Sequence, residues 1–225
     1  MKVMRRLFPL IVTIVFMFAF VACGGGADEP VQDALVELPG VEITPTPAVT
    51  PVPEQEQPDD SENVGTFSER WDEAVNVGGF TSTEARASFA ASAISLQTFN
   101  ERWDEITDAG RFTSRTARAS FAASTVSLQS FNDRWDEAVN VGGFTSTEAR
   151  ASFAASTISL QAFNDRWNEI TDAGRFTSRI ARASFAASTV SLQTFNDRWD
   201  EAVNIGGFTT VEARSSFAAS TVPLQ

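Results

Sequence analysis

Tryptophan recurs at one constant interval in the second part of this chain. The positions are Trp71, Trp103, Trp135, Trp167 and Trp199. The residues around each tryptophan are nearly identical, so the segment from Thr66 to Gln225 consists of five copies of a 32-residue unit. Their bounds are 66–97, 98–129, 130–161, 162–193 and 194–225. A fixed period of this length is typical of repeat proteins, in which each unit buries its apolar face against its neighbours.

Odd and even copies differ in a consistent way. The first and third copies contain RWDEAVNVGGFTSTEARASFAAS, whereas the second contains RWDEITDAGRFTSRTARASFAAS and the fourth follows it closely. The true repeat is therefore a 64-residue pair of units.

Each unit has the composition of a helix. No Gly or Pro interrupts residues 81–109, which are rich in Ala, Glu, Arg and Leu. The segment Thr81-Ser82-Thr83-Glu84 has the form of a capping box, in which the Thr side chain covers a free backbone N–H and Glu84 reaches back. Gly110 is expected to end this helix, as Gly78-Gly79 and Gly142-Gly143 end its neighbours.

The large apolar residues favour one long helix per unit. Phe121, Leu128, Phe131 and Trp135 follow a heptad spacing. A helix from one glycine turn to the next would have about 26 residues and a length of about 40 Å. The sequence thus predicts an all-α fold, an up-and-down array of long antiparallel helices.

Two other interpretations remain. A break near STVSLQ would give two short helices per unit, as in an αα-hairpin solenoid. Pro223 favours that break, because it replaces a recurring serine and proline is tolerated at a helix start. A strand in TVSLQSF is disfavoured by its Ala-rich flanks. The array begins and ends with complementary half units, so the terminal pieces are expected to pair or to act as caps.

The N-terminus has the three parts of an export signal. Lys2, Arg5 and Arg6 precede an apolar run that ends in Phe20-Val21-Ala22-Cys23. The apolar run from Leu7 to Ala22 is short for a membrane span, which needs about 20 residues. Its end resembles the lipobox of bacterial lipoproteins, with Phe20 in the aliphatic position. The resemblance implies cleavage after residue 22 and acylation of Cys23, with palmitate among the acyl groups.

Residues 23–65 are expected to form the lipidated cysteine and a disordered tether. The segment 24–65 contains seven of the nine prolines and ten acidic residues, with no Lys or Arg. Such a composition cannot bury enough apolar surface to offset its ordering entropy. The predicted domains are a signal peptide (1–22), this anchor and linker (23–65), and the helical repeats (66–225).

Charge limits the partners of the repeats. Residues 66–225 contain 14 Arg and 19 acidic residues, with no Lys or His. Nucleic acid is therefore excluded as a partner, and anionic lipid surfaces are unfavourable ones. The acid groups around Arg134 predict a solvated, self-paired helix face. No calcium loop is present, and no cofactor or metal is expected.

The repeated tryptophans and arginines are the candidate binding residues. The five tryptophans, with Phe99, Phe131, Phe163 and Phe195, form either an aromatic track for sugar rings or peptides or part of the core. Burial of such a side chain is worth about 1.5 to 3 kcal/mol, which favours the core. Even copies add four arginines, expected to pair with Asp108 or Asp172 across the turn or to form an anion-binding rim. They are Arg111, Arg115, Arg175 and Arg179.

Catalysis is not expected. The repeats lack His, Cys, Lys and Tyr, and their carboxylates recur in every copy, whereas an active site is singular. The sequence predicts a lipoprotein on the extracytoplasmic face of a bacterial cell membrane, with a non-catalytic repeat domain that serves as interaction scaffold or spacer. The alternative is a binding protein for envelope polysaccharide or a protein partner. Nearly identical copies also favour association between chains.

Overall fold

The computed structural model describes residues 65–225, so the predicted signal peptide, Cys23 and most of the linker lie outside the described residues. Within 65–225 there are ten α-helices and no strand, which confirms the all-α class and excludes the strand interpretation there. The longer helices are α1 (Phe67–Asn76), α3 (Leu96–Asp108), α5 (Leu128–Asn140), α7 (Leu160–Asp172) and α9 (Leu192–Asn204). The shorter ones are α2 (Thr83–Ala90), α4 (Arg115–Ala122), α6 (Thr147–Ala155), α8 (Arg179–Ala187) and α10 (Val211–Ala219).

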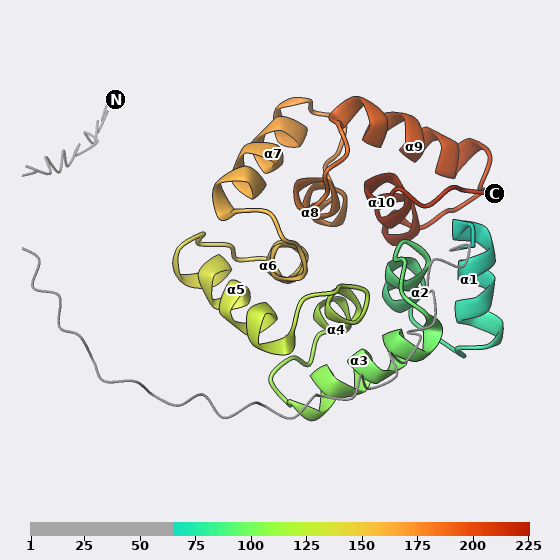
Figure 1. Cartoon of the computed structure of the whole chain (residues 1–225). Coiled ribbons are helices and arrows are strands. Elements are labelled where there is room, and N and C mark those ends of the chain that lie inside the picture. The colour runs from blue at the N-terminus through green and yellow to red at the C-terminus, as the bar shows by residue number, and fades with distance from the viewer. Residues whose placement is uncertain (1–64) are drawn as a thin grey trace, which may run out of the picture. The chain divides into compact units, whose positions relative to one another are not determined.

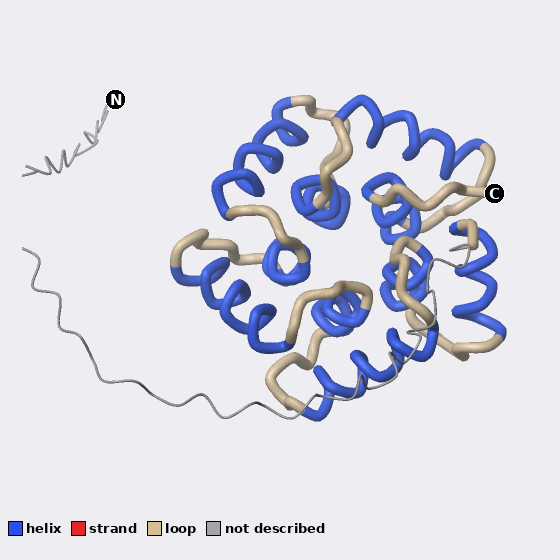
Figure 2. The backbone as a smooth tube through the Cα atoms, in the orientation of Figure 1, coloured by secondary structure: helices blue, strands red, loops and turns tan. Residues whose placement is uncertain are grey.

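The ten helices form a closed ring of five hairpins, each made of a long helix and the short helix that follows it (Figure 1). The short helices stand side by side around a central axis, and α10 packs directly on α2. The long helices lie outside them around the ring, and loops join each long helix to the short helices before and after it in the chain (Figure 2). We call the outer surface formed by the long helices the rim.

The predicted long helices are wrong. Each short helix ends within a few residues of its phenylalanine, and the chain leaves helical geometry before the next long helix begins. Ser127 is the N-cap of α5, and its hydroxyl accepts a hydrogen bond from the Ser130 N–H. Serine at this position recurs as the N-cap of α3, α7 and α9, a local start signal that outweighs the absence of Gly and Pro. The interpretation with two short helices per unit is correct, but the ring is closed and not an open solenoid.

The expected turns are correct at their glycines and differ at their caps. The N-cap of α2 is Ser82, not Thr81, and no capping box with Glu84 forms there. Gly110 follows the end of α3 with φ of 69°, and Gly79 follows the end of α1 with φ of 62°. Both lie in the left-handed region that glycine adopts without strain.

The core consists of one aromatic cluster per hairpin. Phe121 of α4 and Phe131 of α5 are fully buried and meet edge to face, with ring centres 5.3 Å apart. Val126, Leu128 and Trp135 pack against them. The residues of the predicted heptad seam are thus neighbours in space, but they converge from two helices.

The ring closes by pairing the two terminal pieces, as one of the two sequence interpretations proposed. The Phe67 N–H donates to the Pro223 carbonyl at 2.7 Å, just as the Phe99 N–H donates to the Ser95 carbonyl at 2.9 Å. Pro223 therefore stands where the other long helices have their N-cap serine. Leu224 is buried in one cluster with Phe67. The C-terminal residues supply the first turn that α1 lacks.

This closure predicts that the ring tolerates circular permutation. Joining Gln225 directly to Thr66 creates the order Leu-Gln-Thr-Phe, which the chain already has at 96–99. We expect residues 66–225, joined in this way and opened between Gly142 and Gly143, to fold with unchanged helical circular dichroism. The thermal midpoint should stay within about 4 °C, or about 1 kcal/mol.

The control removes Leu224 and Gln225 from the same joint, which shifts Phe67 out of register with its buried position. This variant should lose most of its cooperative thermal transition. Equal stability of the two permuted chains would contradict the closure.

Candidate functional site

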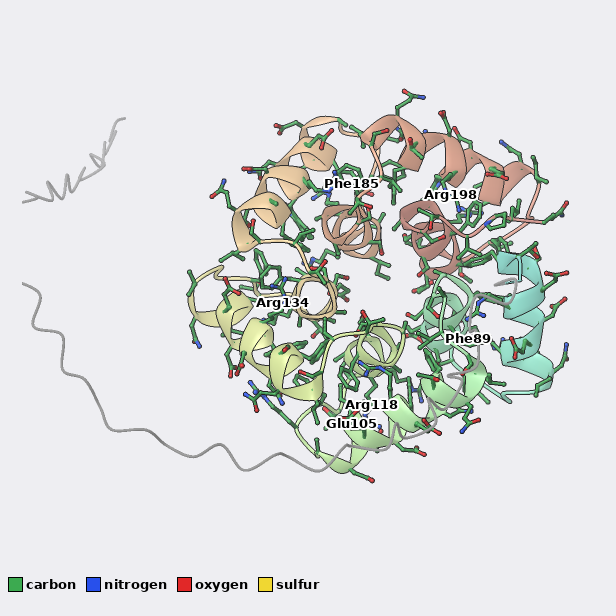
Figure 3. All side chains as sticks on the ribbon, viewed as in Figure 1. Phe89, Glu105, Arg118, Arg134, Phe185 and Arg198 are labelled. Atoms are coloured by element: carbon green, nitrogen blue, oxygen red, sulfur yellow. The ribbon has the colours of Figure 1, made fainter. Side chains whose placement is uncertain are left out.

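One arginine of every long helix holds the end of the following short helix. Arg134 of α5 donates from Nη2 to the Phe153 carbonyl at 3.0 Å, to Ser156 Oγ at 3.3 Å and to the Ile158 carbonyl at 2.6 Å. Its guanidinium carbon lies 4.1 Å from the centre of the Phe153 ring. Figure 3 labels Arg134 among the side chains of the ring. The carbonyls at a helix C-terminus have no partner within the helix, and this side chain supplies one.

The same contacts recur in all five hairpins, through Arg70, Arg102, Arg134, Arg166 and Arg198. Burial lowers the pKa of Arg134, and the negative charge of Glu137 opposes that shift. The guanidinium remains charged, because its ordinary pKa is far above neutrality. The prediction that Arg134 pairs with the acids beside it is therefore wrong, because its donors point at backbone carbonyls.

A second set of arginines holds the turn before each short helix. Arg118 Nε donates to the Phe112 carbonyl at 2.8 Å. Equivalent bonds are made by Arg86, Arg150, Arg182 and Arg214. Ten of the 14 arginines of the ring thus bind backbone within the ring.

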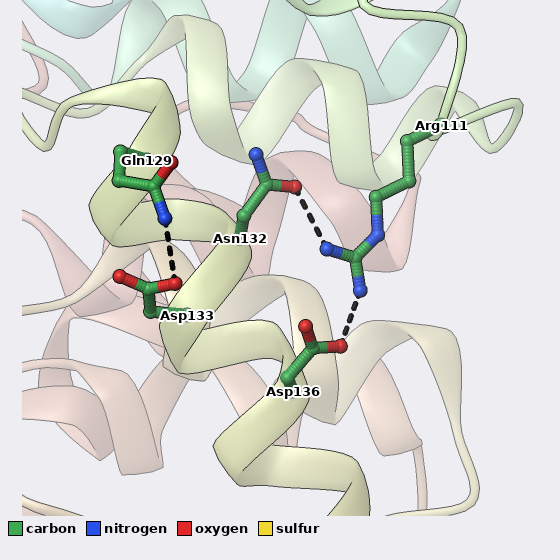
Figure 4. A network of polar contacts seen from close by, with 5 residues as sticks. All are labelled: Arg111, Gln129, Asn132, Asp133 and Asp136. Carbon is green, nitrogen blue, oxygen red and sulfur yellow. Dashed lines mark hydrogen bonds and ion pairs between the residues drawn. The ribbon is translucent and has the colours of Figure 1, made fainter.

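The four candidate arginines fall into two kinds. Arg111 donates to Asn132 Oδ1 at 3.1 Å and forms an ion pair with Asp136, both on the next long helix (Figure 4). Arg175 binds Asn196 and Asp200 in the same way. The expected pairs with Asp108 and Asp172 are therefore wrong for Arg111 and Arg175.

Arg115 and Arg179 are exposed at the first positions of α4 and α8. Neither forms an ion pair within residues 65–225. Of the four candidates, these two are the cations left for an external anion.

The five tryptophans lie between the core and the rim. Each is half-buried and packs on a different aromatic cluster, so they form no continuous track. Trp135 meets Phe112 edge to face, with ring centres 4.9 Å apart. One part of each indole packs as core and another part reaches the surface.

A channel along the ring axis was not foreseen from the sequence. One part, of about 250 Å³, is lined by Ser and Ala of all five short helices and of the residues just after them, including Ser88 of α2 and Ser92. A second part, of about 240 Å³, includes Glu84, Glu148 and Glu212 near the helix N-termini. The two parts share one serine from each helix. The signal was the small residues at positions 88, 91 and 92, which share one helix face.

Other site types find no support in residues 65–225. No three His, Cys, Asp or Glu side chains there are grouped so as to hold a metal ion. None of the described helices has the length and apolar character needed to cross a membrane. Comparisons with protein families, with curated protein sequences and with solved structures give no match to this chain.

The capping arginines predict a large and specific loss of stability. Replacing Arg134→Met removes charge-assisted bonds to two carbonyls and one hydroxyl. We expect the free energy of unfolding to fall by about 2 kcal/mol, measured by urea denaturation. Arg134→Lys should recover only part of this loss, because one ammonium cannot reproduce the planar fork.

The matched control is Arg115→Met. Arg115 is exposed and has no ion pair in the ring, so the change should stay within about 0.5 kcal/mol. Equal losses for Arg134→Met and Arg115→Met would refute the capping role.

Proposed function

We propose that this protein is a membrane-anchored surface lipoprotein whose helical ring is a non-catalytic interaction scaffold or spacer. The ring would be built from five copies of a 32-residue unit, with a 64-residue pair as the larger repeat. One observation carries the proposal. Because α10 packs on α2 and the Pro223 carbonyl accepts a hydrogen bond from the first residue of α1, the repeated hairpin faces are used inside the ring. The rim is then a repeated surface that stays exposed to other molecules.

The charge of the rim indicates the kind of partner. Of the 19 acidic residues in 66–225, all but Glu84, Glu148 and Glu212 belong to the long helices. Ten arginines donate to backbone carbonyls within the ring and form no ion pairs with these acidic residues. A basic protein surface suits such a rim, whereas nucleic acid and anionic lipid do not.

The anchor is proposed from the sequence, because it lies outside the described residues. Acyl chains on Cys23 would hold the protein on the extracytoplasmic face of the cell membrane. Two or more acyl chains give stable membrane attachment. The linker up to Gly65 would span about 35 Å as a flexible coil and up to about 130 Å if extended, which sets the distance of the ring from the bilayer.

Nearly identical repeats predict that copies of the chain associate through their hairpin faces, but these faces are already covered within the ring. A hairpin of another chain can bind the hairpin faces only if the ring opens, because α2 and α10 already cover each other. For the same reason, loss of one pair of units should disrupt the ring, contrary to what an open array would tolerate.

The second candidate is a binding protein for envelope polysaccharide or a protein partner, through the tryptophans and the exposed arginines. The half-burial of all five indoles favours it, since a sugar ring can stack on the part of an indole face that remains exposed. Acrylamide quenching of tryptophan emission separates the two. If the ring is a scaffold, acrylamide should quench the tryptophan emission weakly, and added polysaccharide fragments should leave the emission unchanged. If it is a receptor, added fragments should change the emission, and this change should saturate.

The main test combines the anchor and the rim. A photo-reactive benzoylphenylalanine at Gln129, which is exposed on α5, should cross-link a protein in intact cells, because the rim faces the partner. The chain should incorporate labelled palmitate and fractionate with the membrane. Cys23→Ala should abolish both the label and the membrane fractionation.

The equivalent positions Gln97, Gln161 and Gln193 serve as replicates of Gln129. No cross-link from any of the four would refute the scaffold. Palmitate label that persists in Cys23→Ala would refute the anchor and leave the rim result standing.

A further inference from the structure

The ring shows twice how its rim holds a guanidinium group. We call the place where the turn of one hairpin meets the next long helix a joint. In the joint before α5, Arg111 donates to Asn132 and pairs with Asp136 (Figure 4). Its guanidinium carbon lies 5.3 Å from the centre of the Phe112 ring. In the joint before α9, Arg175 makes the same contacts with Asn196, Asp200 and Phe176.

The joint before α3 has the same receiving groups without the arginine. Gly79 stands in the position of Arg111, while Asn100, Asp104 and Phe80 stand in the positions of the three groups that Arg111 contacts. Asn100 and Asp104 are exposed, and Asp104 has no ion pair within residues 65–225. A Cβ atom placed on Gly79 would meet no other atom within 4 Å, so the space beside Gly79 is open.

The phenylalanine of this joint is also more accessible than its counterpart. Phe112 is 4% exposed, whereas Phe80 is half-buried. The turns differ by one residue, since the left-handed glycine is Gly79 here and Gly110 in the other joint. The shift leaves part of the Phe80 ring available to a cation.

The two remaining joints lack part of the set. In the joint before α7, Asn168 replaces the carboxylate. In the joint before α1, Ser68 replaces the asparagine. The complete set of amide, carboxylate and aromatic ring without an arginine therefore occurs once in the ring, at Asn100, Asp104 and Phe80.

We propose that the surface formed by Asn100, Asp104 and Phe80 binds the guanidinium group of an arginine side chain on a partner protein. The inference rests on the proposed scaffold function and names the chemistry of its partner. A guanidinium fits better than an ammonium, because its planar fork directs two donors at two neighbouring acceptors and its face stacks on an aromatic ring.

The test uses the full chain, labelled with ¹⁵N and kept soluble in detergent. Acetyl-arginine amide is titrated while the side-chain amide of Asn100 and the backbone amide of Asp104 are followed by NMR. We expect saturable shifts at both residues in the millimolar range, and at least fivefold weaker binding of acetyl-lysine amide.

Two variants match each other. Asp104→Asn should weaken binding at least fivefold, and it should fold, because the chain already has Asn168 at the equivalent position. Asn168→Asp should create a second site, seen as new shifts at Asn164. Absence of a saturable shift at Asn100, equal binding of the lysine compound, or an unaffected Asp104→Asn variant would overturn the proposal.

The outcome is distinguishable from failure of the scaffold function. Without arginine binding, cross-linking from Gln129 would persist and only the partner chemistry would be refuted. With arginine binding and no cross-link from any rim position, the site would stand and the scaffold would be refuted.

Discussion

The contact between an arginine of each long helix and the end of the next short helix determines the architecture. Arg134 reaches forward along the chain to the carbonyls of Phe153 and Ile158. It thereby satisfies the end of α6, fixes the loop to α7 and stacks on a core phenylalanine. Five such contacts let short helices of 8 or 9 residues stand side by side, although helices of that length are marginal alone.

The sequence is informative where signals are local and uninformative where they act over a distance. Glycine at 78–79 and 110 correctly marks the ends of the long helices, and the apolar residues at 121, 128, 131 and 135 correctly mark the core. The break after each short helix is absent from the preferred interpretation, because no Gly or Pro marks it. Its signals are the serine N-cap, which is readable, and an arginine contact such as that of Arg134 with Phe153, which only the folded chain brings together.

The candidate site residues show the same difference between local signals and contacts that only the folded ring makes. The sequence places the tryptophans in the core and they lie half in it, because each indole covers a cluster that the phenylalanines already fill. The sequence predicts that Arg111 pairs across its own turn. In the structure Arg111 pairs with Asp136 on the next long helix, which only the ring geometry brings near. The axial channel depends on ring closure, a property of the whole ring, so the serines of one repeat do not predict it.

The number of hairpins has a consequence of its own. Joints with and without an arginine bridge alternate along the chain, but a closed ring of five cannot alternate all the way round. Two joints without a bridge must be neighbours, and they lie on either side of the hairpin α1–α2. Because the number of joints is odd, one part of the nearly fivefold ring differs from the rest. We call this part, the hairpin α1–α2 with its two joints, the distinct sector. That sector is also the one to which the preceding chain is covalently attached, so tension on the proposed tether would act first on the hairpin that has no arginine bridge on either side.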